Sequence, residues 1–323
     1  MRKIAVLFMI MMLLVTGCGK GAADGTTESQ TQSEATEAQA EGQDSTEALT
    51  ESQAEVPAAV VDTVQTDSFS MDYCKFGSGE RTLVILPGLS IQSVMGSADA
   101  VAQAYQTLAQ DYTIYLFDPP KELPDSYPVY EAAEDVAEAL QALGLEKVSI
   151  FGASYGGMKA MLIAARHPEM VEKTIVVSTS ANLTDEEFQT VENWISLAKA
   201  GDAEGLYLAF GEALYPKEVY EQSRQLLIDA AKTVTEEELS RFVIQAEGMR
   251  GLDMTDQLDQ IQCPMLAIGD RQDHVLGGTA TEKIGDYMSE NADFQLYMYD
   301  GYGHAVYDLA PDIKERMKDF LMQ

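Results

Sequence analysis

The chain has 323 residues, of which 46% are hydrophobic, so it is long enough and apolar enough to bury a sizeable core. It carries 53 acidic against 21 basic residues, a formal net charge of −32. This charge disfavours nucleic-acid binding and polyanionic substrates, although a local basic pocket could override the overall field. Three histidines are too few for a histidine-rich metal site, and no Cys or His cluster has metal-ligand spacing.

The N-terminal segment has the pattern of a targeting sequence. Arg2 and Lys3 precede an uninterrupted apolar run over residues 4–15, which is too short for a membrane-spanning helix of about 20 residues. The run ends in Val-Thr-Gly-Cys18, which resembles a bacterial lipobox. The resemblance implies that residues 1–17 are a signal peptide and that Cys18 carries a lipid anchor on the extracytoplasmic side of the bacterial cell membrane. An ordinary secretory signal is the alternative.

We expect residues 18–60 to comprise the lipidated cysteine and an acidic tether. From residue 19 onward they are almost wholly Gly, Ala, Thr, Ser, Gln and Glu, without one aromatic side chain. Such a segment cannot bury enough apolar surface to offset the entropy lost on ordering. We therefore expect a disordered tether, followed by a folded domain over residues 61–323.

From residue 69 onward, short β-rich runs alternate with helical stretches. This alternation indicates parallel strands joined by crossover helices. We therefore expect an α/β domain with a mostly parallel central sheet and helices on both faces. The expected strands are 69–76, 82–86, 112–117, 147–151, 174–177, 264–268 and 294–299, and the expected helices are 98–108, 130–143, 158–166, 279–288 and 311–321.

The alternation stops between residues 183 and 259, where the pattern is purely helical. Two helix starts in this stretch have capping-box spacing, Thr184 with Glu187 and Thr235 with Glu238. A helical insertion of this size between two strands predicts a lid over one end of the sheet. Most of its aromatic side chains should form the lid's own core, and the rest should line a pocket.

The pentapeptide from Gly152 to Gly156 reads Gly-Ala-Ser-Tyr-Gly and is followed by Gly157. It follows a buried strand and opens a helix, which is the context of a nucleophile elbow, a sharp strand-to-helix turn that exposes a serine. Residues two before and two after the serine must be small so that strand and helix can pass closely, and both are glycine. The pattern predicts Ser154 as a nucleophile, with a glycine-rich turn without chemistry as the alternative.

With this motif in this context, residues 69–323 resemble the α/β-hydrolase superfamily, in which the chain order is nucleophile, acid, histidine. The resemblance implies that His304, between the last expected strand and the final helix, is the general base that takes the serine proton and returns it to the leaving group. His274 is the alternative base, whereas His167 is interpreted as a helix-end residue.

The resemblance places the acid in the loop after strand 264–268, where two aspartates compete. Asp273 fits the family spacing, three or four residues after a glycine, while Asp270 looks like a turn residue that caps the loop. The acid's task is to orient His304 and to stabilise the imidazolium.

An oxyanion hole needs two preorganised N–H donors. By the same resemblance, the backbone of Tyr155, directly after the serine, would supply one. The backbone of Leu89 would supply the other, from a loop where many relatives have His-Gly and this chain has Pro87-Gly88. That departure removes a bracing side chain but not the donor; a plain β-turn is the alternative.

Two cysteines, Cys74 and Cys263, lie in the expected domain. In the implied fold, Cys74 belongs to the first, edge strand, and Cys263 leads into the strand after the lid. Several strands at about 4.8 Å each would separate them, beyond the roughly 7 Å Cα limit for a disulfide. We expect both thiols to be free.

Together these residues predict a serine esterase that cleaves an acyl, ester-type bond of a small or medium-sized substrate through an acyl-enzyme on Ser154. No metal or organic cofactor is implied. One alternative is an aminopeptidase-type peptidase, which needs lid carboxylates such as Glu204 or Glu212 to hold the substrate amine. Another is a surface lipoprotein that only binds a ligand or partner. The substrate's identity and the oligomeric state do not follow from the sequence.

Overall fold

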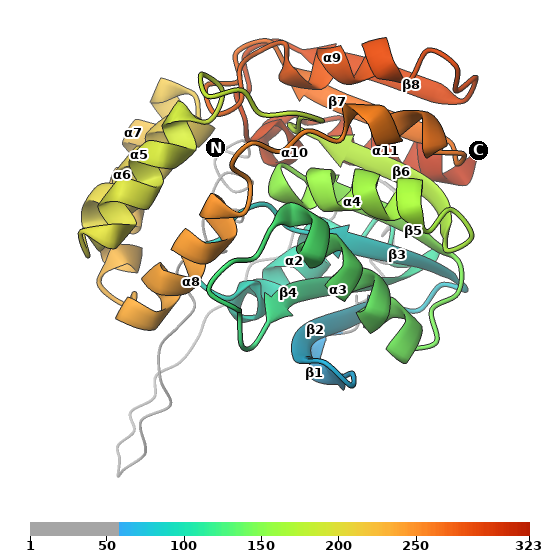
Figure 1. Cartoon of the computed structure of the whole chain (residues 1–323), viewed down its shortest axis with the longest axis horizontal. Coiled ribbons are helices and arrows are strands. Elements are labelled where there is room, and N and C mark those ends of the chain that lie inside the picture. The colour runs from blue at the N-terminus through green and yellow to red at the C-terminus, as the bar shows by residue number, and fades with distance from the viewer. Residues whose placement is uncertain (1–57) are drawn as a thin grey trace, which may run out of the picture. The chain divides into compact units, whose positions relative to one another are not determined.

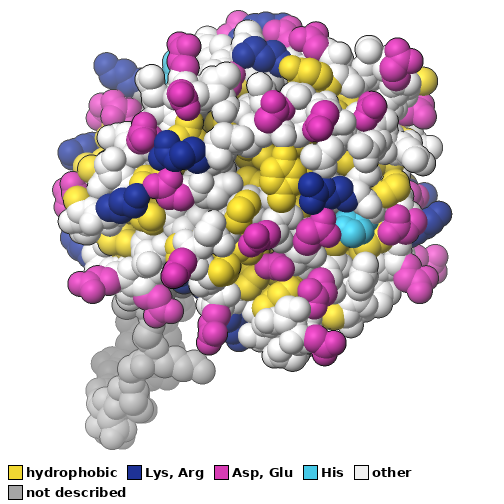
Figure 2. Space-filling view, in the orientation of Figure 1, with side chains coloured by type: hydrophobic (Ala, Val, Ile, Leu, Met, Phe, Trp, Pro, Cys, Tyr) yellow, Lys and Arg dark blue, Asp and Glu magenta, His cyan; other side chains and the backbone are white. Residues whose placement is uncertain are grey.

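The computed structural model describes residues 58–323 (Figure 1). The expected signal peptide, the tether as far as residue 57 and the lipidation site at Cys18 lie outside the described residues. Within the described part, no helix has the length and apolar character needed to span a membrane. Acidic side chains are spread over the face drawn in Figure 2, in keeping with the net charge of −32.

An eight-stranded sheet runs through the described domain. The strands are β1 (Val60–Gln65), β2 (Ser70–Gly77), β3 (Arg81–Leu86), β4 (Tyr112–Pro120), β5 (Val148–Ala153), β6 (Val171–Val177), β7 (Met265–Asp270) and β8 (Phe294–Tyr299). Their order is β1-β2-β4-β3-β5-β6-β7-β8; β2 runs antiparallel to both its neighbours, and the other pairs are parallel. This confirms the expected α/β class with a mostly parallel sheet.

Helices cover both faces of the sheet, as crossover connections require (Figure 1). These helices are α2 (Ala98–Ala104), α3 (Val129–Ala142), α4 (Tyr155–Arg166), α9 (Ala280–Tyr287), α10 (Val306–Leu309) and α11 (Ile313–Met322).

Strand side chains alternate between two hydrophobic cores because successive residues of a strand point to opposite faces. In β3, Leu83 and Ile85 belong to the core with α2, α10 and α11. Val84 and Leu86 belong to the core with α3, α4, α9 and the lid. The central strand β3 is therefore buried on both faces, whereas the edge strands β1 and β8 are largely exposed.

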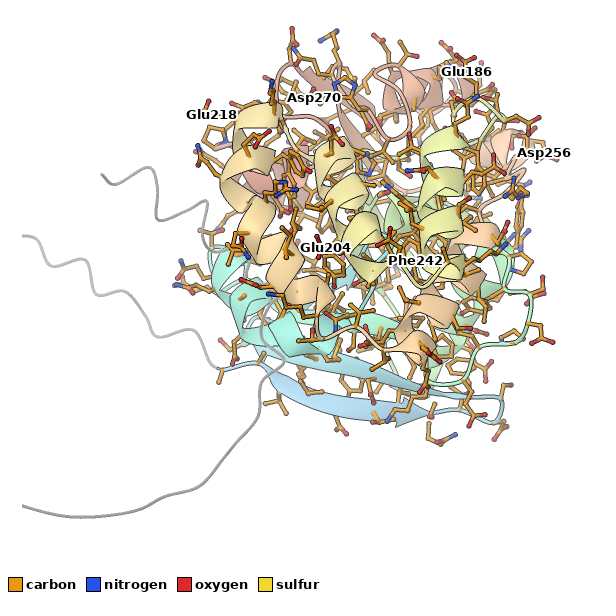
Figure 3. The ribbon with its side chains drawn as sticks, turned by 90° about the vertical axis from the view of Figure 1, so that its left-hand side faces the viewer. Glu186, Glu204, Glu218, Phe242, Asp256 and Asp270 are labelled. Carbon is orange, nitrogen blue, oxygen red and sulfur yellow. The ribbon has the colours of Figure 1, made fainter. Side chains whose placement is uncertain are left out.

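Between β6 and β7 the chain forms the lid, on the left in Figure 1 and facing the viewer in Figure 3. Its helices are α5 (Gln189–Lys199), α6 (Ala203–Leu214), α7 (Lys217–Ala231) and α8 (Glu236–Glu247). A β-bridge between Asn182 and Asp253 closes the base of the lid. Beyond it, η3 (Thr255–Gln260) packs against α4, so the last residues of the stretch expected as lid pack on the sheet domain.

The two expected capping boxes differ in outcome. Thr235 and Glu238 form a complete capping box at the start of α8. Thr184 and Glu187 exchange the same pair of hydrogen bonds, but they close a turn, and α5 begins only at Gln189.

The expectation that Cys74 lies on the edge strand was wrong, because β1 pairs with β2 and forms the edge instead. β1 was missed because only Val64 of its six residues is buried, so it lacks the apolar alternation of a half-buried strand. The expected domain start at residue 61 falls inside this strand. Cys74, on β2, and Cys263, just before β7, are both free and buried, with β4, β3, β5 and β6 between those strands.

Strand β5 and helix α4 pass each other at a distance that only glycine permits. A Cβ atom on Gly152 would lie 2.3 Å from the carbonyl oxygen of Gly156. A Cβ atom on Gly156 would lie 1.9 Å from the carbonyl oxygen of Leu86 on β3. The neighbours are backbone atoms of the central sheet and of the helix, so they cannot move aside as a flexible side chain could.

We therefore expect Gly156→Ala to destabilise the fold by about 2–3 kcal/mol, because the new methyl group overpacks a rigid junction. The matched control is Gly285→Ala in α9, where the added Cβ atom finds its nearest neighbour, a ring carbon of Phe294, at 3.4 Å. That change should stabilise the fold by up to about 1 kcal/mol through helix propensity. Urea unfolding checks both values; equal stabilities of the two variants would contradict the close approach.

Candidate active site

Ser154 occupies the sharp turn between β5 and α4. Its backbone has φ 52° and ψ −119°, and it is one of two non-glycine residues with positive φ in the described chain. Such a conformation costs about 1–3 kcal/mol and persists only where the surroundings enforce it. Here its N–H donates to the carbonyl of Val177 at 2.9 Å, and its carbonyl accepts from the Thr179 hydroxyl at 2.8 Å. The turn has the geometry expected of a nucleophile elbow.

The loop after β3 lies directly against this serine. A Cβ atom on Gly88 would lie 3.3 Å from the Cβ atom of Ser154, so the loop backbone and the serine are in contact. In the described structure, neither the N–H of Leu89 nor that of Tyr155 donates a hydrogen bond to another residue. Both N–H groups therefore have no acceptor among the described residues, and their role as an oxyanion hole stays a prediction.

His304 and Asp273 form a buried hydrogen-bonded pair. His304 Nδ1 lies 2.8 Å from Asp273 Oδ2, and the two residues are 2% and 6% exposed. The other carboxylate oxygen, Oδ1, accepts from the N–H groups of Val275 and Leu276 at 2.8 and 3.1 Å. This arrangement leaves Nε2 of His304 as the ring nitrogen that can act on a second partner.

Burial by itself would raise the pKa of Asp273, but the nearby imidazole of His304 and the two N–H donors lower it below its ordinary value of 3.8. The carboxylate is therefore ionised throughout the neutral range. Because this pKa is lower in the folded chain than in the unfolded one, the stabilisation is present above about pH 4 and is lost as the pH falls through the folded pKa.

Asp270 is buried as well, but its carboxylate ties two loops together. Oδ1 accepts from the N–H groups of Gln272 at 2.8 Å and Gly301 at 3.3 Å, and Oδ2 accepts from Tyr302 N–H at 2.9 Å. Asp270 thus joins the loop after β7 to the loop after β8, which carries His304. Its position matches the capping role expected for it, and Asp273 is the aspartate that contacts the histidine.

The other two histidines lie elsewhere. The His274 side chain is exposed, and His167 caps the end of α4 with Nε2 2.8 Å from Glu134. Of the three histidines, His304 is the one that lines a cavity together with Ser154. Within residues 58–323, no group of three or more His, Cys, Asp or Glu side chains is arranged to hold a metal ion.

Ser154 and His304 line one cavity beneath the lid. It measures about 20 Å³, roughly the space of one water molecule, and Trp194 and Phe210 of the lid line it as well. The indole N–H of Trp194 is buried without an acceptor in the described structure. A substrate must therefore displace lid side chains to reach the serine.

A larger, mostly apolar cavity of about 170 Å³ adjoins this one and shares Gly88 and Leu89 with it. Aromatic and aliphatic side chains of the sheet and the lid dominate its walls. Its one carboxylate is Asp308, where burial raises the pKa to about 6 and the neighbouring Lys314 opposes that rise. This space fits the apolar part of a small or medium-sized molecule.

The sequence interpretation missed a third, polar cavity beside the loop after β3, lined by Lys159, Asp118 and Arg241. A signal was available, because Lys159 is a lone charge in the otherwise apolar stretch Met158–Ala165 that follows the elbow. A charge on a helix that should be buried on every side needs a reason.

The strained serine turn, the free N–H groups and the buried His–Asp pair at the carboxyl ends of the strands define a hydrolase of α/β architecture. The sequence model of the alpha/beta hydrolase fold family matches residues 81–311, and the chain belongs to this family.

Named relatives are similar at low identity. The chain is 24% identical over 240 residues to the putative carbamate hydrolase RutD of Rhizobium rhizogenes, covering 72% of this chain and 88% of that protein. It is 24% identical over 231 residues to the human serine hydrolase BPHL, covering 67% and 74%. Among solved structures, MGS-M2, an alpha/beta hydrolase enzyme from a Medee basin deep-sea metagenome library, has a TM-score of 0.72 at 19% identity, covering 81% and 98%.

We expect Asp270→Ala to lower the free energy of unfolding by about 3 kcal/mol, because three loop N–H groups lose their charged acceptor. Urea unfolding provides the measurement. The control is Asp300→Ala. The exposed carboxylate of Asp300 accepts only from the Gln272 side chain, so its removal should change the free energy of unfolding by less than about 0.5 kcal/mol. Equal effects of the two substitutions would contradict the bracing role.

Proposed function

We propose that this hydrolase cleaves an acyl, ester-type bond through a covalent acyl-enzyme on Ser154. The observation that carries the proposal is that Ser154 and His304 line one cavity. Nδ1 of His304 lies 2.8 Å from the Asp273 carboxylate, so the imidazole is held in place. A serine in a strained turn, beside an imidazole that a buried carboxylate orients, is the arrangement that activates a hydroxyl group.

In the proposed reaction, His304 takes the proton of the Ser154 hydroxyl as the oxygen attacks the substrate carbonyl. The free N–H groups of Leu89 and Tyr155 stabilise the oxyanion of the tetrahedral intermediate. His304 then gives the proton to the departing alkoxide, and the acyl-enzyme forms. A water molecule, deprotonated by the same imidazole, then attacks the acyl carbon, and the imidazolium returns the proton to the Ser154 oxygen as the bond to the acyl group breaks and the acid leaves. Asp273 stays ionised throughout and stabilises the imidazolium.

The apolar cavity beside Gly88 and Leu89 supports a small or medium-sized acyl substrate. The similarity to a putative carbamate hydrolase and to a serine hydrolase supports the hydrolysis of acyl-type bonds by a serine enzyme.

The two alternative functions, an aminopeptidase-type peptidase and a protein that only binds a ligand, receive less support. Glu204 and Glu212, the lid carboxylates suggested for holding a substrate amine, are exposed on α6 and line none of the cavities described above (Figure 3 labels Glu204). A protein that only binds a ligand would not need the strained conformation of Ser154, which costs stability without helping to form a pocket.

We further propose that the lipobox-like sequence ending at Cys18 anchors the enzyme to the extracytoplasmic side of a bacterial membrane. The support is the order of charge, apolar run and cysteine in the sequence.

We predict that a fluorophosphonate probe labels the full-length protein. Labelling should fall by at least about a thousandfold in Ser154→Ala, which lacks the nucleophile, and in His304→Ala, which lacks the base. The rate of probe incorporation, followed by in-gel fluorescence, provides the measurement.

His274→Ala is the matched control, because this exposed histidine is one residue from Asp273 and should leave the labelling rate unchanged. A well-folded parent protein that takes up no probe would exclude an activated serine and would favour the binding-protein alternative.

A further inference from the structure

Lys159 is a buried cation that the proposed reaction does not use. It lies on α4, five residues after Ser154, and is only 6% exposed. Its ammonium group lies 4.7 Å from the centre of the Tyr155 ring. No hydrogen bond from this ammonium group to another described residue is present, although an ammonium group has three donors to satisfy. Burial lowers the pKa of Lys159 to about 8, while Asp118 opposes that decrease.

The cavity that Lys159 lines, about 110 Å³ in volume, also contains two carboxylates, but both already have partners. Asp118 accepts from the Ser93 hydroxyl group and from the Val94 N–H. Glu238 accepts from the Gln92 amide and, at the start of α8, from Thr235.

The second cation of the cavity, Arg241, is held in place by the carbonyl oxygens of Pro120 and Lys121, to which it donates. The hydrogen-bonding capacity left open in this cavity therefore includes all three donors of the Lys159 ammonium group. A ligand that satisfies them must carry acceptors, and a negative charge would offset the burial of the cation.

This polar cavity is adjacent to the cavity of Ser154. Gly88 lines the polar cavity, the apolar cavity and the small cavity at the serine. Pro87 and Ser90 separate the polar space from the apolar one and line both. A molecule whose scissile carbonyl lies at Ser154 thus has two directions open to it, one apolar and one that ends at Lys159.

We propose that the polar cavity is a carboxylate subsite, and that the preferred substrates are esters with a carboxylate group on one side of the scissile bond. This inference rests on the proposed function of the same site. The ammonium group of Lys159 binds the carboxylate, and the rest of the molecule extends past Gly88 into the apolar cavity. The lining holds two cations and two carboxylates within a protein of net charge −32, so the subsite takes a single small anionic group at Lys159 and disfavours a polyanion.

Two matched pairs of esters test the subsite in the full-length protein. In the first pair the carboxylate is on the acyl side: 4-nitrophenyl hydrogen glutarate against 4-nitrophenyl 5-methylhexanoate, in which an isopropyl group replaces the carboxylate. In the second pair it is on the alcohol side: 4-acetoxybenzoate against 4-isopropylphenyl acetate. The quantity to compare is the ratio of kcat/KM for the anionic ester to that for its neutral partner.

In at least one pair, Lys159→Met should lower this ratio by about tenfold or more, mainly through KM, because a charge-assisted contact to the carboxylate is lost. Lys159→Gln, which keeps a donor but not the charge, should lower it less and serves if the methionine variant does not fold. The matched control is Lys147→Met, which removes an exposed lysine just before β5 and should leave both ratios unchanged.

A binding measurement separates this inference from the proposed reaction. Calorimetry with glutarate on the Ser154→Ala variant needs no turnover, and it should show saturable binding that Lys159→Met abolishes in the same background. If no ester is hydrolysed but glutarate binds in this way, the reaction fails and the subsite holds. If neutral esters are hydrolysed while Lys159→Met changes neither ratio and glutarate does not bind, the subsite is overturned and the reaction stands.

Discussion

The close approach of β5 and α4 is the constraint on which the rest of the site depends. Glycine at positions 152 and 156 lets the helix start directly against the strand, and this forces Ser154 into its positive-φ turn. The same approach brings the loop after β3 against the serine, because Gly156 packs on the Leu86 carbonyl at the end of that strand. The proposed nucleophile and the N–H groups proposed to bind the oxyanion thus come from one packing arrangement, and the stability of the central sheet offsets the strain of the turn.

The histidine side of the site is built differently, from two long loops held by carboxylates. Asp270 fixes the backbone of both loops, and Asp273 fixes the imidazole of His304. Asp270 therefore has a structural role, while Asp273, three residues further on, contacts the histidine. The lid adds apolar cover, so electrostatic interactions at the serine act in a site with little water.

Much of this arrangement could be predicted from the sequence. The elbow glycines, the β/α alternation and the helical insertion leave local patterns that point to Ser154. The family resemblance implied His304, with His274 as the alternative, and left Asp273 and Asp270 competing for the acid. Strand β1 could not be predicted, because a mostly exposed edge strand has no apolar alternation. The lone charge of Lys159 in an apolar helix was a signal that was not used. The walls of its cavity and the partners of Asp270 could not be predicted, since both arise from residues brought together across the fold: Arg241 of the lid, for example, meets the end of β4.

If Ser154 is the nucleophile, its side-chain oxygen accepts the acyl group, and the resulting acyl-enzyme can be trapped. A short-chain 4-nitrophenyl ester would be mixed with the full-length protein, the reaction quenched in acid within milliseconds to seconds, and the digested protein analysed by mass spectrometry. We expect the acyl group on Ser154, in amounts that rise with the burst of nitrophenol and decay with turnover. Ester hydrolysis with no acylated peptide, or with the acyl group on another residue, would contradict this role of Ser154.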